Sequence, residues 1–509
     1  MIHANENHNN CSTITFRVLI FARAVKMKAF RSIFLLYSYG ASVIYALSYW
    51  HSSPSANQET SPTTDDVSEP LFLTPLINAG NLSEARNRSR VPPLLDHIES
   101  YAGFFTVNQT SKSHLYFWFI PKTNNDNSSA PLILWLREAS TMFSLFNENG
   151  PFRITKDGLQ KRQYAWTDHY HMLYIDTLVG AGYSFTEADG YVGSNDEVAK
   201  YLYAALRQFY QLFPQFRTHD LYIAGDAGTF IPALGYTIHT ADRQAGASEI
   251  RVPLKGMIIG NGISDSENKI EYATFLHTIG LIDRRERTQL EGNLRRMGYL
   301  IRSGKWTQAA DEHAKLNADI REMIGEISAY DYTRDSSDLK ELMDTHVKYI
   351  TQDEVRKSIH VGRIKYDVIP SALTDRVRKN FGRPVSSFIE ELLKHYRILF
   401  YNGQFDLSSS HLLNKSFLRN LHWSGAYDFN EAKKRIWVSG ESSVAGYYKV
   451  SGNLVYVMVR NAGHLVSFDQ PKHGLTLISR FVGGRSDDDS TWWTAKYTEN
   501  EFSKFLQSD

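Results

Sequence analysis

The chain has 509 residues, of which 42% are hydrophobic and 22% are charged, and its formal net charge is +1. This length fits one large domain or a few average ones, and the small net charge argues against a nucleic-acid-binding or polybasic membrane-binding protein. The one cysteine is Cys11, which excludes a disulfide framework and a thiolate metal site. We therefore expect no nucleic acid, no metal and no cofactor as partners.

Residues 1–50 predict an N-terminal extension with a signal peptide. A basic start at residues 27–31 precedes an uncharged apolar run at 33–50, and small residues at 46–48 suit a signal peptidase. Translation from Met27 is one alternative, and an uncleaved anchor, the expected route to any membrane contact, is another. Residues 51–69, rich in Ser, Thr and Pro, predict a disordered linker.

Glycosylation sequons support the same route through the secretory pathway, to an extracellular or lysosomal location. The Asn-x-Ser/Thr pattern occurs in five places that we expect to be glycosylated: Asn81, Asn87, Asn108, Asn127 and Asn414.

Residues 70–485 show alternating strand and helix signals. Short apolar runs predict buried strands at 131–136, 173–175, 221–224, 257–259, 397–401 and 454–459. A capping box at Ser194 and Glu197 begins a helix that closes before Pro214. The alternation predicts an α/β protein, with a mostly parallel central sheet and helices on both faces. The charged, helical residues 264–375 predict an inserted helical cap, and residues 486–509 form a C-terminal tail.

Three glycine-containing turns follow predicted strands, and the carboxyl ends of such strands meet at one edge of the sheet. The first turn is Gly225-Asp226-Ala227-Gly228, and the later two contain Asp406 and His464. The order elbow, Asp, His is that of an α/β-hydrolase triad, with Asp406 orienting His464 as the general base. The elbow nevertheless lacks the serine of Gly-x-Ser-x-Gly. The alternative is that Asp406 and His464 are ordinary loop residues.

The chain resembles the serine carboxypeptidase family, most closely its vitellogenic and venom branch, from about residue 70 to 484. The matching segments are 70–75, 100–104, 147–151, 179–185, 354–362, 402–406 and 462–471. The resemblance implies an α/β-hydrolase fold, a peptidase that releases C-terminal amino acids at acid pH, and peptides with a free C-terminus as partners.

Two motifs of this family are altered here. The family elbow is Gly-Glu-Ser-Tyr-Ala-Gly, so pairing Asp226 with the Glu leaves only Ala227 and Gly228 to complete the turn. The nucleophile and one oxyanion donor are then missing. After the strand at 132–136, the family has an Asn-Gly-Gly-Pro-Gly loop that completes the oxyanion hole. Here that strand is followed by Arg-Glu-Ala-Ser-Thr at 137–141, without glycine.

Residues that hold the substrate in the family have partial counterparts. There, two glutamates share a proton and bind the terminal carboxylate of the peptide. Glu148 and Asp226 match those positions, and Trp135 is a further substrate-binding candidate. The alternatives are two turn carboxylates without a ligand and a tryptophan that belongs to the core.

The sequence therefore predicts a secreted or lumenal serine carboxypeptidase-like glycoprotein that has lost catalysis and has a binding or stabilising role. One alternative is an active serine-type carboxypeptidase whose sequence carries gene-prediction errors at both motifs. Another is a structural or storage glycoprotein. The sequence does not indicate an oligomeric state.

Overall fold

The computed structural model describes residues 69–123, 129–187, 189–246, 249–262, 271–368, 370–439 and 443–483. The predicted signal peptide, the linker up to residue 68, Asn127 and the C-terminal tail lie outside these residues. Among the residues that are described, no helix is both long and apolar enough to cross a membrane.

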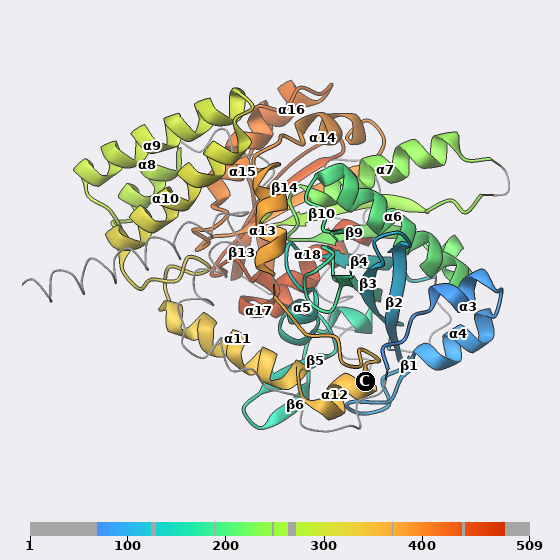
Figure 1. The fold of residues 1–509 in the computed structure, drawn as a ribbon. Coiled ribbons are helices and arrows are strands. Elements are labelled where there is room, and N and C mark those ends of the chain that lie inside the picture. Colours follow the sequence, from blue (N-terminus) through green and yellow to red (C-terminus); the bar gives the residue numbers. More distant parts are fainter. Residues whose placement is uncertain are drawn as a thin grey trace, which may run out of the picture.

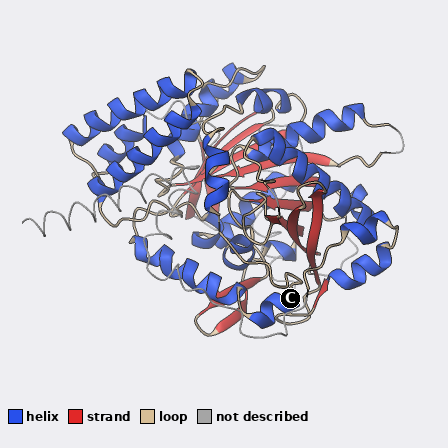
Figure 2. Cartoon of the chain, viewed as in Figure 1, coloured by secondary structure: helices blue, strands red, loops and turns tan. Residues whose placement is uncertain are grey.

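A 12-stranded sheet forms the centre of the molecule, with helices packed around it (Figures 1 and 2). Its middle strands run parallel to their neighbours. In spatial order they are β7 (His171–Ile175), β4 (Leu132–Leu136), β9 (Leu221–Gly225), β10 (Leu254–Gly260), β11 (Arg397–Gly403) and β14 (Leu454–Val459). All six predicted strands are therefore confirmed, and so is the α/β class.

Antiparallel strands extend this sheet on both sides. On one side lie β1 (Arg90–Val91), β2 (Ser100–Asn108), β3 (Ser113–Ile120) and the short β8 (Phe185–Thr186), and on the other lie β13 (Ser443–Ser451) and β12 (Arg435–Ser439). A separate hairpin joins β5 (Phe152–Thr155) to β6 (Gly158–Lys161).

Helices follow the strands as the alternating pattern predicts. The helix α6 (Asn195–Leu212) begins at the predicted capping box, in which the Ser194 side chain accepts a hydrogen bond from the Glu197 backbone N–H. Its apolar face is buried, and it ends just before Pro214. The other helices outside the cap are α3 (Thr74–Asn78), α4 (Leu82–Ser89), α5 (Met142–Asn147), α7 (Phe230–Gln244), α14 (Ser386–Leu392), α15 (His411–Arg419), α16 (Ala426–Glu431), α17 (Val466–Asp469) and α18 (Pro471–Gly483).

The region predicted as a cap is helical and has its own hydrophobic cluster. Its helices are α8 (Glu271–Thr278), α9 (Arg284–Arg302), α10 (Trp306–Ile324), α11 (Ser336–Ile350), α12 (Asp353–Ser358) and α13 (Ser371–Arg378). Figure 1 shows α8, α9 and α10 side by side at one end of the molecule. Their buried cluster also contains Phe143, Leu407 and Leu465, which lie in segments that follow sheet strands. The cap thus packs against the edge of the sheet where the candidate site lies.

Candidate active site

The turn after β9 keeps the strand-turn-helix shape of a hydrolase elbow. Gly225 ends the strand with φ +145°, and a β-carbon there would lie 1.8 Å from the Leu136 carbonyl oxygen, so a glycine is required. Asp226 follows in the turn, and the helix α7 begins at Phe230. The residue that this elbow presents is therefore Asp226.

Ala227 and Gly228 complete the elbow without supplying a reactive group. The methyl side chain of Ala227 is fully buried and belongs to the hydrophobic core. Gly228 is also buried, and its backbone N–H donates to the Asp226 carbonyl oxygen at 3.0 Å, which closes the turn. Both residues therefore contribute to the bend, and neither a methyl group nor a glycine hydrogen is a nucleophile.

Asp406 and His464 form an intact pair at the ends of β11 and β14. His464 Nδ1 lies 2.9 Å from Asp406 Oδ2, and both side chains are fully buried. The Ser409 backbone N–H donates to Asp406 Oδ1 at 3.0 Å, which orients the carboxylate. The Asn261 side-chain amide donates to the His464 carbonyl oxygen and holds the loop. This is the arrangement that a triad requires of its acid and its base.

The group nearest the other nitrogen of His464 is a carboxylate and not a hydroxyl. Asp226 Oδ2 lies 3.8 Å from His464 Nε2 and 3.2 Å from Arg137 Nε. In a working triad, a serine hydroxyl would donate its proton to Nε2 at this place. An ionised carboxylate has no proton to give, so it interacts with His464 by charge instead.

Arg137 lies at the centre of the site, and its role was not predicted from the sequence. It directly follows β4, and its side chain is almost completely buried. Arg137 Nη1 lies 2.7 Å from Glu148 Oε1 and donates to Ser144 Oγ at 3.2 Å. We call the five linked residues the charge network; in order of contact they are Glu148, Arg137, Asp226, His464 and Asp406.

The network changes the protonation of His464. Burial by itself would lower the pKa of this histidine, but the charge and hydrogen bond of Asp406 and the nearby charge of Asp226 raise it to about 9. His464 is therefore an imidazolium at neutral and acid pH. A general base must be unprotonated to accept a proton, so this state is unsuited to that role.

The two carboxylates that we matched to substrate binding are occupied by Arg137. Burial raises the pKa of Glu148, while Arg137 opposes that effect. Arg137 lies between Glu148 and Asp226, with Nη1 2.7 Å from Glu148 Oε1 and Nε 3.2 Å from Asp226 Oδ2, so an ion-pair bridge joins the two carboxylates. A peptide carboxylate would have to displace a buried ion pair to reach them.

Trp135 belongs to the core. Its side chain is 2% exposed and packs edge-on against Trp166, with ring centroids 5.2 Å apart. This placement favours the alternative of a core residue over a direct contact with substrate.

The loop after β4 does not present its N–H groups as an oxyanion hole would. The Thr141 N–H donates to Asp176 Oδ1 at 2.8 Å, and the Arg137 N–H donates to Thr177 Oγ1 at 3.3 Å. Ser140 Oγ also donates to Asp176. These two N–H groups are committed within the protein and are not free to stabilise a developing oxyanion.

A cavity of about 370 Å³ lies next to the charge network, between α11, α17 and the hairpin of β5. Tyr330 lines this cavity and also covers His464, with ring centroids 4.3 Å apart. A pocket therefore persists beside the altered reaction centre.

The predicted glycosylation sites differ in accessibility. Asn81 and Asn87 are exposed, and Asn108 is partly buried and donates to the Tyr201 hydroxyl at 2.9 Å. The fold disfavours the prediction for Asn414. This side chain on α15 is 3% exposed, and its amide donates to Asn402 Oδ1 at 3.1 Å.

Comparisons with known proteins agree with this geometry. Residues 92–484 match the family model described as serine carboxypeptidase. Venom serine carboxypeptidase of Apis mellifera is 37% identical over 436 residues, which cover 82% of this chain and 92% of that relative. Probable serine carboxypeptidase CPVL of Homo sapiens is 35% identical over 447 residues, which cover 84% of this chain and 92% of that relative.

A solved structure supports the fold. KEX1(DELTA)P, a prohormone-processing carboxypeptidase from Saccharomyces cerevisiae, matches with a TM-score of 0.71 at 21% identity, and the match covers 78% of this chain and 96% of that one. The chain, with its α/β-hydrolase fold and its Asp406–His464 pair, belongs to the serine carboxypeptidase family.

Proposed function

We propose that this protein is a secreted or lumenal serine carboxypeptidase-like glycoprotein that has no peptidase activity and acts by binding. One observation carries the proposal: the group that faces His464 Nε2 is the carboxylate of Asp226, held in an ion pair with Arg137. The reaction centre thus holds charged groups of opposite sign where the family has a serine hydroxyl.

Three losses act on the same reaction. Removing the serine of such a triad lowers turnover by about 10⁶, and losing one oxyanion donor lowers it by about 10²–10³. A histidine with a pKa of about 9 is also protonated where the family works. These effects are not additive, but the first is sufficient to end useful peptidase activity.

The charge network also bears on the alternative of an active enzyme with an erroneous sequence. Arg137 and Asp226 lie in the two altered segments, and they form an ion pair with each other. Two independent gene-prediction errors would not be expected to create complementary buried charges. This complementarity favours the sequence as written, and sequencing the transcript across codons 137–141 and 225–229 tests it.

The cavity beside Tyr330 is the proposed binding site of a peptide with a free C-terminus. Two of its cations are already paired, because Lys156 contacts Glu341 at 2.7 Å and Arg334 contacts Asp469 at 3.0 Å. Arg153, at the exposed edge of the hairpin, makes no ion pair with a described residue. We assign the terminal carboxylate of the peptide to Arg153.

Two assays test this function separately. Hydrolysis of a blocked dipeptide is measured at about pH 5, in the acid range that suits carboxyl pairs in this family, with the Apis mellifera relative as positive control. We expect no turnover above the uncatalysed rate, and turnover that a serine-directed phosphonofluoridate abolishes would refute the loss of catalysis.

The binding role is tested by thermal stabilisation with peptides that have a free or an amidated C-terminus. A larger shift for the free form, lost in Arg153→Gln, is expected. Equal shifts, or no shift, would favour a structural or storage role.

A further inference from the structure

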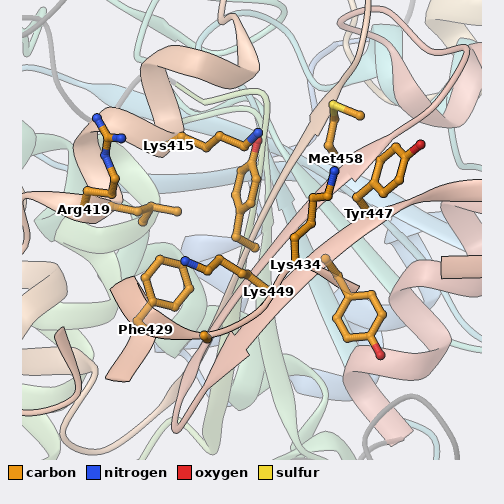
Figure 3. A pocket seen from close by; sticks show the side chains of 11 residues that line it. Lys415, Arg419, Phe429, Lys434, Tyr447, Lys449 and Met458 are labelled. Atoms are coloured by element: carbon orange, nitrogen blue, oxygen red, sulfur yellow. The ribbon is translucent and has the colours of Figure 1, made fainter. Parts of the chain in front are cut away.

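A second cavity lies between β13, β14 and the helices α15 and α16, and it contains none of the residues of the charge network. Its volume is about 490 Å³, which is within the usual range for small-molecule sites. Four cations line it: Lys415, Arg419, Lys434 and Lys449. We call it the basic pocket, and Figure 3 shows its side chains.

The lysines of the basic pocket have no carboxylate partners within the described part of the chain. Each ammonium group lies near an aromatic ring (Figure 3), and Lys449 Nζ also donates to the Asn430 carbonyl oxygen at 2.8 Å. Lys434 Nζ is 4.3 Å from the Tyr447 ring centroid, and Lys449 Nζ is 5.3 Å from that of Phe429. Lys415 Nζ is 5.8 Å from the centroid of Tyr456. Such contacts attract an ammonium group through the ring face, but they do not give it the charged acceptor that an anion would supply.

Few acids offset this charge. Arg419 pairs with Glu271 at 3.0 Å, and Glu431 at the end of α16 acts on Lys449 through its charge. Burial lowers the pKa of Lys415, and the neighbouring cations Lys434, Arg419 and Lys449 lower it further. The cations therefore repel one another, and an anion placed between them would relieve that repulsion.

The floor of the basic pocket is apolar. Leu418 and Phe429 are buried, and Met458 on β14 lines the other end of the pocket, opposite Tyr447 in the pairing of β13 with β14. A ligand that fits this arrangement has an anionic group for the cationic rim and an apolar body for the floor. A lysine ammonium is a common phosphate ligand, and a planar ring packs well on Phe and Tyr side chains.

We propose that the basic pocket binds a phosphate or sulfate monoester that carries an apolar body. The phosphate or sulfate group is held by Lys415, Lys434 and Lys449, which turn away from their aromatic rings, and Lys449 also leaves the Asn430 carbonyl oxygen. The apolar body contacts Leu418 and Phe429. This site is independent of the peptidase chemistry and of the cavity beside Tyr330.

Calorimetric titration with phenyl phosphate and with inorganic phosphate tests the proposal on the full chain. We expect saturable binding that weakens with salt, and phenyl phosphate should bind more tightly than inorganic phosphate because its ring reaches the floor. The double variant Lys415→Gln/Lys449→Gln should lose affinity by at least about tenfold. Lys200→Gln, an exposed lysine of α6 outside the pocket, should leave affinity unchanged.

The melting temperature of the double variant is measured as well, because the variant removes mutual repulsion but also the hydrogen bond from Lys449 to Asn430, and this measurement distinguishes a folding defect from lost binding. Vesicles of phosphatidylcholine with phosphatidic acid separate two sources of the same group. Vesicle binding that the double variant loses assigns the phosphate to a lipid, and binding of phenyl phosphate alone assigns it to a soluble ligand. The proposal would be overturned if neither phenyl phosphate nor the vesicles bind. It would also be overturned if wild type and the double variant bind equally, or if phenyl phosphate and inorganic phosphate bind with equal affinity.

Discussion

Replacing Arg137 by methionine should destabilise the protein strongly, because it removes the cation that lies between Glu148 and Asp226. Methionine keeps much of the side-chain volume, so the main effect is electrostatic. Burial already raises the pKa of Glu148 while Arg137 opposes it. Without the guanidinium, Glu148 would keep only the hydrogen bond from Ser144, and Asp226 only the charge of His464 at 3.8 Å.

The magnitude follows from the burial of the pair. Removing one partner of a buried ion pair costs about 3–5 kcal/mol, whereas an exposed pair contributes about 0–1 kcal/mol. Arg137 and Glu148 have side chains that are each 7% exposed. Arg88 and Glu84, whose side chains are 56% and 59% exposed at a separation of 3.9 Å, provide the matched control.

Thermal unfolding of Arg137→Met and Arg88→Met is compared at about pH 7 and about pH 5. In Arg137→Met the carboxylates hold protons more tightly in the folded than in the unfolded state. The loss of stability in Arg137→Met is therefore full at the higher pH and becomes smaller as the pH falls. Adding Glu148→Gln should recover part of the loss at the higher pH. The reasoning is refuted if Arg137→Met loses no more stability than Arg88→Met. It is also refuted if the loss of stability in Arg137→Met does not depend on pH.

Two further predictions concern His464 and Asn414. The folded pKa of His464, about 9, lies above its ordinary value of 6.5, so its contribution to stability is full below about pH 6.5 and is lost as the pH rises through about 9. We expect the free energy of unfolding of wild type, measured with urea, to fall by up to about 3 kcal/mol over that interval relative to that of His464→Asn. Histidines with lowered pKa values, such as His346 and His411, are already neutral there and do not interfere; parallel pH profiles of the two proteins would contradict the assignment. For Asn414, intact-mass analysis of secreted protein should show no glycan lost in Asn414→Gln, whereas Asn81→Gln should lose one if that exposed sequon is used. A glycan on Asn414 would mean that α15 is accessible during or after folding.

Much of the fold could be predicted because the central strands are buried on both faces. Such strands appear as short apolar runs, and β4 and β9 are buried at every position. The antiparallel strands were missed. β3 is also buried throughout, and residues 115–120 form an unbroken apolar run, so this strand was overlooked although its pattern is present in the sequence.

The candidate site was predictable only in part. The order of Asp406 and His464 along the chain identified the remaining pair, because strand order brings their loops to one edge of the sheet. Arg137 was recognised as a departure from the family loop, but the sequence did not show which residues it contacts. Its contacts with Glu148 and Asp226 join three different loops, and no local pattern encodes that packing.

The central claim is that the elbow presents Asp226 in place of a reactive serine. The most direct measurement is the intact mass of the purified protein after treatment with a phosphonofluoridate that labels activated serines. We predict no added mass, while the Apis mellifera relative, treated in parallel, takes up one label per chain. A single stoichiometric label on this protein would contradict the account.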